Sequence, residues 1–251
     1  MDTFDKTRAG SAESWLSDFS AALSAADAGA IAALFHPDSH WRDLLAFTWH
    51  ISTVSGPAKI ADALAGRAGE LEPRSFHVDY DATPPRMVTR GGREDVLEAV
   101  FRFTTKTGRC SGVLRMIADE ADAGRLKAWT ILTALDEISG FEESIGTARP
   151  TGEAYSRDFK GPNWLDRRNI AIAYEDRDPE VLVVGGGQAG LSIAARLTQL
   201  GVDTLIVDKE ERVGDNWRKR YHALVLHNQV HVNHLPYMPF PPNWPTYIPK
   251  D

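Results

Sequence analysis

The sequence VLVVGGGQAGLSIAARL, residues 181–197, joins a buried type of strand, a glycine cluster and the start of an amphipathic helix. Its first four residues are almost continuously β-branched, as expected of a parallel strand that is covered on both faces. Apolar residues then recur at helical spacing as far as Leu197, and Gly201 is placed to end the helix. A second apolar run, TLIV at residues 204–207, ends at Asp208. The segment therefore predicts one βαβ unit.

The glycine cluster matches the pattern G-x-G-x-x-G, which is weak alone and informative between a buried strand and a helix. Gly185 would permit the tight turn, and Gly187 would let the backbone approach a pyrophosphate. Gly190 would allow the helix to pack closely on the strand. These residues favour a dinucleotide-binding fold, and an ordinary βαβ unit without a nucleotide is the alternative.

The residues around the glycines complete the predicted site. Backbone N–H groups at the helix start, at Gln188 and Ala189, would meet the phosphates. Asp208 lies 18 residues after Gly190, close to the usual spacing of about 20, and its carboxylate would accept the ribose hydroxyls. The neighbouring Lys209 or Glu210 is the alternative contact for the ribose. FAD and NAD share this pattern, so it does not distinguish them.

The composition of the 251 residues is that of an ordinary globular protein, with a net charge of −7. The chain is long enough for two small domains, and it has no basic field for a nucleic-acid backbone. The single cysteine, Cys110, cannot form an internal disulfide, and we expect a buried structural thiol in a reducing compartment. No signal peptide or run of about 18 apolar residues occurs, so we expect a cytoplasmic protein that does not enter a membrane.

Residues 1–136 predict an α+β domain, in which helices cover one face of a curved antiparallel meander. Two helices are expected between Ser11 and Phe35, followed by a turn at residues 36–38. A further helix is expected from Pro57 to a stop at Gly66. The predicted strands lie at residues 48–54, 75–80, 96–104, 110–118 and 126–135, and a short additional run lies at 41–47.

The rest of the chain is expected to form two parts. Residues 137–178 mix glycine, proline and charged residues and predict a connector that contains one helix, at Trp164 to Tyr174. Residues 179–251 are expected to form a truncated α/β Rossmann-type unit.

Two stretches after Asp208 resemble the class B flavin-containing monooxygenases. VGDNWRKRY, residues 213–221, is similar to the family's G-G-x-W-x-x-x-Y stretch, although Asp215 replaces the second glycine. LVLHNQVHVNHLPYMPFPPNWPTY, residues 224–247, is similar to the stretch that ends in F-P-x-x-P-F-P and an aromatic residue. The resemblance implies that residues 181–251 bind FAD. The matching contact positions are Asp208, Asn216, Trp217, His227 and Asn228.

The same segment contains four histidines, at positions 222, 227, 231 and 234. A metal site is the alternative interpretation of these residues. The segment has no cysteine or carboxylate partner at ligand spacing, so we expect no metal.

The resemblance implies a flavin-dependent monooxygenase that consumes NADPH and adds one oxygen atom to a small organic substrate. Members of the family bind NADPH through a second glycine-rich motif, which is not present in this sequence. We therefore expect the 251 residues to be the N-terminal part of a longer enzyme, and the sequence identifies no catalytic residue.

Residues 11–136 resemble the NTF2-like cone, which the SnoaL-like cyclases and ketosteroid isomerase share. In enzymes with this fold, an acid or histidine in the cone abstracts a proton beside a carbonyl. The candidates here are His40, Asp43, His50 and Asp79, for which capping, pairing with Arg42 or ordinary hydrogen bonding is the alternative. Two other functions remain open: a non-catalytic ligand- or partner-binding module with a remnant flavin domain, and a small isomerase or cyclase. The resemblance also implies a homodimer that pairs through the open face of the sheet.

Overall fold

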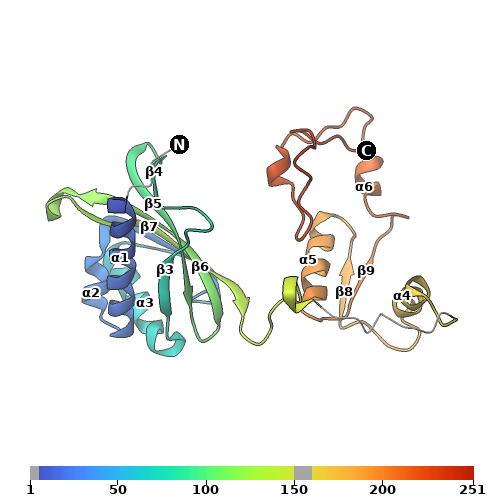
Figure 1. Ribbon diagram of the computed structural model, residues 1–251, viewed down its shortest axis with the longest axis horizontal. Coiled ribbons are helices and arrows are strands. Elements are labelled where there is room, and N and C mark those ends of the chain that lie inside the picture. Colours follow the sequence, from blue (N-terminus) through green and yellow to red (C-terminus); the bar gives the residue numbers. More distant parts are fainter. Residues whose placement is uncertain (1–5, 150–159) are drawn as a thin grey trace. The chain divides into compact units, whose positions relative to one another are not determined.

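The computed structural model describes residues 6–149 and 160–251, and the chain forms two compact units (Figure 1). The first unit is Met1–Phe141 and the second is Glu142–Asp251. Part of the expected connector, at residues 150–159, lies outside the described residues.

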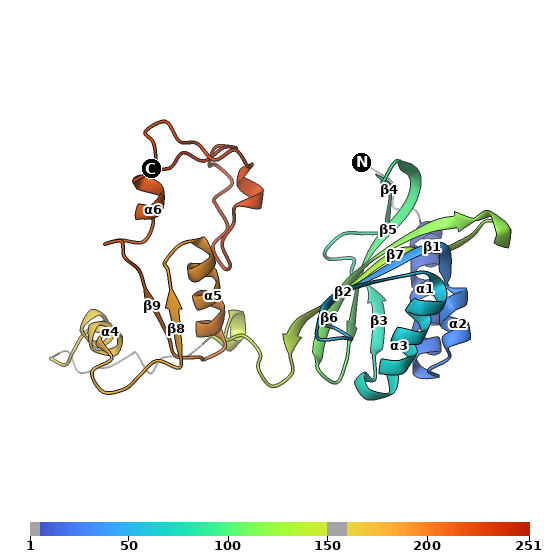
Figure 2. The ribbon, with the colours of Figure 1, turned by 180° about the vertical axis from the view of Figure 1, so that it is seen from behind.

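Three helices cover one face of the sheet in the first unit: α1 (Lys6–Ser24), α2 (Ala28–Ala33) and α3 (Pro57–Leu71) (Figures 1 and 2). Asp27 caps α2 by accepting a 2.9 Å hydrogen bond from the backbone N–H of Ala30. The predicted stop of α3 at Gly66 is wrong. The helix continues to Leu71 because the apolar periodicity also continues, and residues on both sides of Gly66 are buried against the sheet.

The sheet of the first unit has seven strands. In chain order they are β1 (Phe35–Leu44), β2 (Ile51–Ser55), β3 (Arg74–Val78), β4 (Arg86–Arg90), β5 (Arg93–Thr104), β6 (Gly108–Asp119) and β7 (Arg125–Ile138). Their spatial order is β2-β1-β7-β6-β5-β3, and β4 also pairs with β5. A short 3₁₀ turn, η1 (Glu120–Asp122), joins β6 to β7.

The sheet differs from the expected meander in three respects. β1 pairs parallel with β7, so the sheet is mixed. β1 also includes residues 36–38, where a turn was expected. A register shift between Phe35 and His40 accommodates the intervening residues, including Pro37. β4 was not predicted at all. The α+β class and the helices on one face of the sheet are confirmed.

Aromatic rings fill the space between the helices and the sheet. Phe76 and Phe103 stack in parallel with centroids 4.8 Å apart, and Phe47 stacks on Phe103 at 5.8 Å. Phe19 makes an edge contact with Phe76 at 5.5 Å. A Cβ at position 112 would lie 2.2 Å from the ring of Phe101, so this close packing requires glycine there. The interior of the cone is a packed aromatic core.

Cys110 lies in this core and forms no disulfide, which confirms the expected buried thiol. Burial raises the pKa of its thiol to about 12, so the thiolate is not formed at neutral pH.

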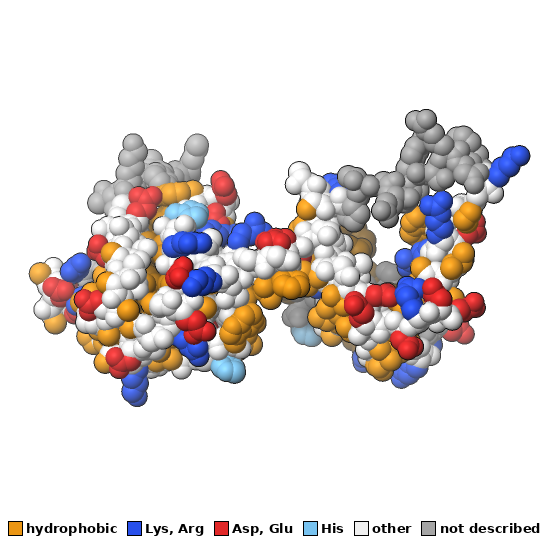
Figure 3. All heavy atoms as spheres, turned by 90° about the horizontal axis from the view of Figure 1, so that it is seen from below, with side chains coloured by type: hydrophobic (Ala, Val, Ile, Leu, Met, Phe, Trp, Pro, Cys, Tyr) orange, Lys and Arg blue, Asp and Glu red, His pale blue; other side chains and the backbone are white. Residues whose placement is uncertain are grey.

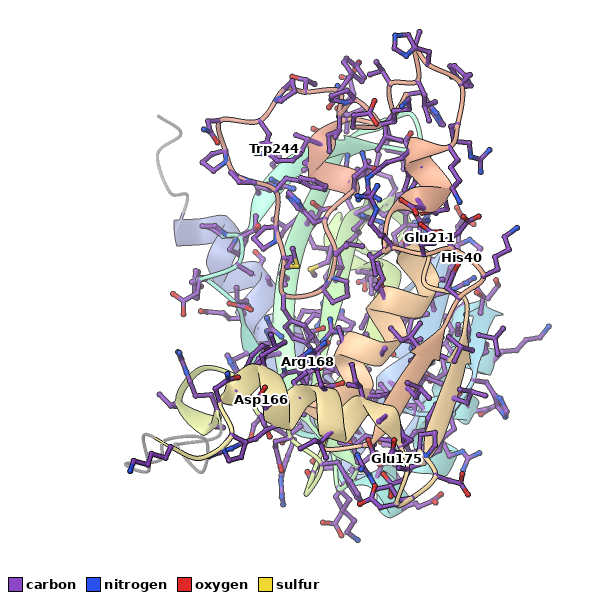
Figure 4. All side chains as sticks on the ribbon, turned by 90° about the vertical axis from the view of Figure 1, so that its right-hand side faces the viewer. His40, Asp166, Arg168, Glu175, Glu211 and Trp244 are labelled. Carbon is purple, nitrogen blue, oxygen red and sulfur yellow. The ribbon has the colours of Figure 1, made fainter. Side chains whose placement is uncertain are left out.

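The second unit contains the expected βαβ unit. Strands β8 (Val181–Val184) and β9 (Thr204–Val207) are parallel, and helix α5 (Gln188–Gln199) connects them. The other elements are η2 (Gly146–Ala148), α4 (Trp164–Ala173), α6 (Asp215–Arg218) and η3 (Val230–Val232). A capping box between Asn163 and Asp166 starts α4. In Figure 4, Asp166 and Arg168 on this helix lie below Glu211 and Trp244.

The second unit buries little apolar surface. Among its described residues, Ala194 and Ile248 are the buried hydrophobic ones. Leu182 and Val184, on one face of β8, are 55% and 83% exposed. Figure 3 shows hydrophobic side chains (orange) at the surface of both units. The small sheet of this unit therefore has an uncovered apolar face.

The proline-rich segment after α6 folds back on itself as a long loop. Leu226 donates its backbone N–H to the carbonyl of Ile248 at 2.8 Å, and Val230 donates to Thr246 at 2.7 Å. These bonds bring the two ends of the segment together.

None of the helices in the described part of the chain combines the length and the apolar character that a membrane span requires.

Candidate dinucleotide-binding site

The turn between β8 and α5 has the backbone geometry that its glycines predict, with a positive φ at one position and a close backbone approach at another. Gly185 has φ +109°, a conformation that side chains with a Cβ rarely adopt. Its N–H donates to the carbonyl of Val207 at 2.7 Å, which extends the β8–β9 pairing into the loop. A Cβ on Gly190 would lie 1.8 Å from the carbonyl oxygen of Gly185. Glycine at position 190 therefore allows the first turn of α5 to pack against the loop.

The N-terminus of α5 is open to an anion. Gly187 is the N-cap and has extended backbone, and no side chain caps the helix. A Cβ at position 187 would come near only the side-chain amide of Asn216, at 3.7 Å. Gln188 and Ala189 form the exposed first turn. Unsatisfied N–H groups and the helix dipole favour negative charge at this end.

Asp208 lies at the end of β9 and faces the glycine loop. One carboxylate oxygen accepts a 2.7 Å hydrogen bond from the N–H of Glu210, and the other accepts a 2.5 Å bond from the N–H of Gly186. The hydrogen bond from Glu210 has the largest effect and, with the bond from Gly186, holds the pKa of Asp208 below its ordinary value. The positive charge of Lys209 lowers this pKa further. The carboxylate is exposed and ionised at neutral pH.

A hollow of about 220 Å³ lies between this carboxylate and the segment after β9. Its lining residues are Gly186, Ile206, Asp208, Glu210, Glu211, Arg212, Val213, Gly214 and Asn216. The volume is below the roughly 300 Å³ at which complete small-molecule sites begin, so the hollow suits one part of a dinucleotide. Ile206 and Val213 give it an apolar wall.

Helix α6 presents Asn216 and Trp217. Gly214, with φ +90°, turns the chain into the helix, and Asp215 follows it. The buried carboxylate of Asp215 accepts a 2.5 Å hydrogen bond from Arg218 and forms an ion pair with Arg212 at 3.4 Å. Arg218 is the main cause that holds the pKa of Asp215 below its ordinary value. Asp215, which replaces the second glycine of the G-G-x-W-x-x-x-Y pattern, thus links two arginines of this turn.

The remaining predicted residues are dispersed. Trp217 is half-buried beneath the guanidinium of Arg220, which is 5.8 Å from its ring centroid. His227 and Asn228 are exposed in the proline-rich loop, and no described contact joins them to the glycine loop. His234 accepts a 2.9 Å hydrogen bond from the N–H of Phe240.

Several lining residues of the hollow were not predicted from the sequence. Gly186 lines the hollow and donates its N–H to Asp208, and Arg212, Val213 and Gly214 approach through the chain turn that follows β9. The middle glycine of the pattern could have been included, because every N–H of such a loop is a potential donor. The other three depend on a turn that has no local periodicity.

The four candidates for proton abstraction in the first unit do not come together, since no described contact joins any two of them directly. His40 contacts the hydroxyl of Ser55 at 2.8 Å, and His50 is exposed. Asp79 accepts a 2.6 Å hydrogen bond from Arg102.

Asp43 is completely buried, and its carboxylate caps a loop. It accepts hydrogen bonds from the backbone of Phe47 and Thr48 and from the hydroxyls of Thr48 and Thr133, at 2.7 to 3.2 Å. Arg42 pairs with Thr53 instead. These bonds give Asp43 a structural role that anchors the loop after β1.

Comparison with known proteins relates the second unit to a family. Residues 183–243 match the NAD(P)-binding Rossmann-like domain. The probable indole-3-pyruvate monooxygenase YUCCA4 of Arabidopsis thaliana is 41% identical over 73 residues, which are 29% of this chain and 18% of that protein. The C-terminal segment is therefore similar in sequence to this monooxygenase.

A second relative is bacterial. The uncharacterized oxidoreductase CzcO-like of Geobacillus kaustophilus (strain HTA426) is 46% identical over 59 residues, 24% of this chain and 17% of that protein. The chain spans about a fifth of the length of these two relatives.

Solved structures similar to the chain have cystatin-like or NTF2-like folds. A domain of unknown function from Nostoc punctiforme PCC 73102 has a TM-score of 0.41 at 11% identity, and covers 54% of this chain and 81% of its own. An NTF2-like protein of unknown function from Shewanella baltica OS155 has a TM-score of 0.37 at 11% identity, and covers 53% and 96%.

Proposed function

We propose that this protein belongs to a flavin-dependent, NADPH-consuming monooxygenase and that residues 179–251 hold FAD. In this proposal residues 1–136 form an NTF2-like domain, residues 137–178 connect the two parts, and the 251 residues are part of a longer enzyme. The observation that carries the proposal is the juxtaposition of the Asp208 carboxylate with the loop that starts α5. The sequence relation to flavin monooxygenases supports FAD over other dinucleotides.

The described residues fit the adenosine and pyrophosphate part of FAD. Because Gly187 has no Cβ, the space beside its backbone is free for a phosphate group. The N-terminus of α5, which follows it, has no side-chain cap. The N–H groups of Gln188 and Ala189 would bind the pyrophosphate. Asp208 has lone pairs beyond the two that it uses, and these would accept the ribose hydroxyls.

Other residues of this unit would enclose the bound group. Asn216, next to Gly187, would donate to a phosphate oxygen, and the apolar wall of the hollow would contact the adenine. In the proposal, Lys209, Trp217, His227 and Asn228 complete the cofactor contacts. When bound, FAD supplies electron transfer from NADPH and the activation of dioxygen, and the protein supplies position and shielding.

Equilibrium binding tests the proposal. FAD, NAD⁺ and NADP⁺ are titrated separately against the full-length protein, and flavin fluorescence or heat release is measured. The proposal predicts that FAD binds tightly and stoichiometrically and that the protein oxidises NADPH only when it contains FAD. Tight binding of NAD⁺ or NADP⁺ with no affinity for FAD would contradict it.

A further inference from the structure

The open face of the first unit's sheet carries a row of polar residues across six strands. Leu97 and Ala99 on β5 point into the core beneath the helices, so Glu98 between them points to the open face. Cross-strand partners point to the same face of a sheet. The row of successive partners is Arg86, Glu98, Arg115, Thr130, His40 and Ser55.

Three arginines of this face converge on the single carboxylate of Glu98. Arg115 donates to it at 2.8 Å, Arg86 donates at 3.0 Å, and Arg90 forms an ion pair at 3.4 Å. The Glu98 side chain is 8% exposed, whereas those of Arg86 and Arg90 are about half exposed. A buried acid thus holds three guanidiniums in place and neutralises one of their three charges.

A fourth arginine extends the cluster to an indole N–H without a partner. Arg93 is the cross-strand partner of Arg90, and its guanidinium lies 5.3 Å from the ring centroid of Trp129. Trp129 is the extra residue of a bulge in β7. Among the described residues, its buried Nε1 has no hydrogen-bond partner. Such a buried donor costs free energy until an acceptor reaches it.

The cluster has more donors than acceptors. Arg93 forms an ion pair with Asp38 at 3.7 Å, so four arginines face two carboxylates. Glu94 and Asp95, in the same hairpin, form no described ion pair with these arginines. Guanidinium donors in a fixed arrangement match carboxylate and phosphate oxygens. An anion held between Arg90 and Arg93 would lie close to the Trp129 ring.

We propose that Arg86, Arg90, Arg93, Arg115 and Trp129 form a binding site for the oxyanion group, carboxylate or phosphate, of a small ligand. The site belongs to the first unit and is independent of the proposed flavin function. Glu98 is its positioning residue, because it orients three of the arginines without facing the ligand.

The test uses the 251-residue chain labelled with ¹⁵N. The Trp129 indole resonance is assigned by its loss in Trp129→Phe. Inorganic phosphate and succinate are titrated in separate arms, and sodium chloride at matched ionic strength is the control. We expect a saturable shift of this resonance with phosphate, with succinate or with both, and none with chloride. The arm that gives the lower dissociation constant identifies the oxyanion class.

Variants assign the shift to the cluster. The double variant Arg86→Gln/Arg90→Gln should weaken binding by at least about tenfold, because two charge-assisted contacts are lost. Arg109→Gln is the matched control, since Arg109 lies on β6, is 73% exposed and pairs with Glu137. Should the double variant not fold, as judged by the dispersion of its spectrum, Arg90→Gln alone takes its place.

Three results would overturn the proposal. They are the absence of a saturable shift with both oxyanions, equal affinities in the double variant and the wild type, and a Trp129 resonance that moves with protein concentration alone. The last result would show that a second copy of the chain occupies this face.

Discussion

The carboxylate of Asp208, at the end of β9, accepts a 2.5 Å hydrogen bond from the backbone N–H of Gly186 in the loop after β8. Asp208, which follows β9, therefore holds the glycine loop that follows β8. Its other oxygen accepts from Glu210 and holds the chain turn that forms the wall of the hollow. One side chain thus shapes both sides of the proposed cofactor site.

Replacing Asp208 with alanine should weaken FAD binding by about ten- to a hundredfold, because charge-assisted hydrogen bonds contribute roughly 1.5 to 3 kcal/mol. Asp208→Asn should lose part of this affinity, since an amide retains one acceptor oxygen. Fluorescence titration of the full-length protein measures the dissociation constants, and circular dichroism checks that the fold is retained. Unchanged affinity in Asp208→Ala would move the ribose contact to Lys209 or Glu210.

The local pattern around residue 185 could be predicted because each feature depends on near neighbours in the chain. A β-branched run, glycines at fixed offsets and an acid after the next apolar run define a βαβ unit without distant contacts. The hollow could be predicted only in part. Its far wall consists of residues 210–214 and Asn216, and their position depends on hydrogen bonds and ion pairs that have no sequence period.

In the first unit the predictions failed where distant contacts outweigh local signals. Gly66 lies in a helix because buried residues beyond it continue the packing on the sheet. The parallel pairing of β1 with β7 joins segments about 90 residues apart, and no local pattern encodes it. Strand β4, RMVTR, was not predicted because it is short and directly follows two prolines.

Limited proteolysis should leave the first unit intact and degrade the second. The first unit has a continuous core of buried aliphatic and aromatic side chains, whereas the described part of the second buries only Ala194 and Ile248 among its hydrophobic residues. Local unfolding is frequent where little apolar surface is buried. We expect cleavage of the 251-residue chain between Glu137 and Glu180, identified by mass spectrometry. Survival of the C-terminal piece with flavin bound would contradict this.

Asp43→Ala should destabilise the first unit by about 3 kcal/mol, because it leaves several buried donors without an acceptor. Asp43→Asn, which retains one acceptor oxygen, should cost less. Urea unfolding followed by tryptophan fluorescence measures both changes. Asp62→Ala, at an exposed position on α3, is the control and should change the free energy of unfolding by less than about 0.5 kcal/mol. A small effect of Asp43→Ala would show that the loop after β1 has other anchors.

The contribution of Glu98 to stability should depend on pH. Burial raises the pKa of Glu98, but hydrogen bonds from Arg115 and Arg86 and the charges of Arg115 and Arg90 outweigh it, so the pKa in the folded state lies below 4.5. A carboxyl group whose pKa is lowered by folding stabilises the folded state at pH values above its unfolded-state pKa. This stabilisation is lost as the pH falls through the folded-state pKa.

The wild type should therefore be more stable than Glu98→Gln at neutral pH, and the difference should shrink below pH 4.5. Urea unfolding at a series of pH values measures it, with Glu94→Gln on the same strand as the matched variant. A difference that grows as the pH falls would contradict the ion-pair cluster.

The most direct test of the proposed flavin site is the flavin content of purified full-length protein with valine at position 187. In the described structure a Cβ there meets only Asn216, at 3.7 Å, so Gly187→Val should fold normally. Its branched side chain would occupy the space that the pyrophosphate needs. We predict that the wild type contains stoichiometric FAD and that Gly187→Val contains none, with equal circular dichroism. Equal flavin content in the two proteins would contradict the site.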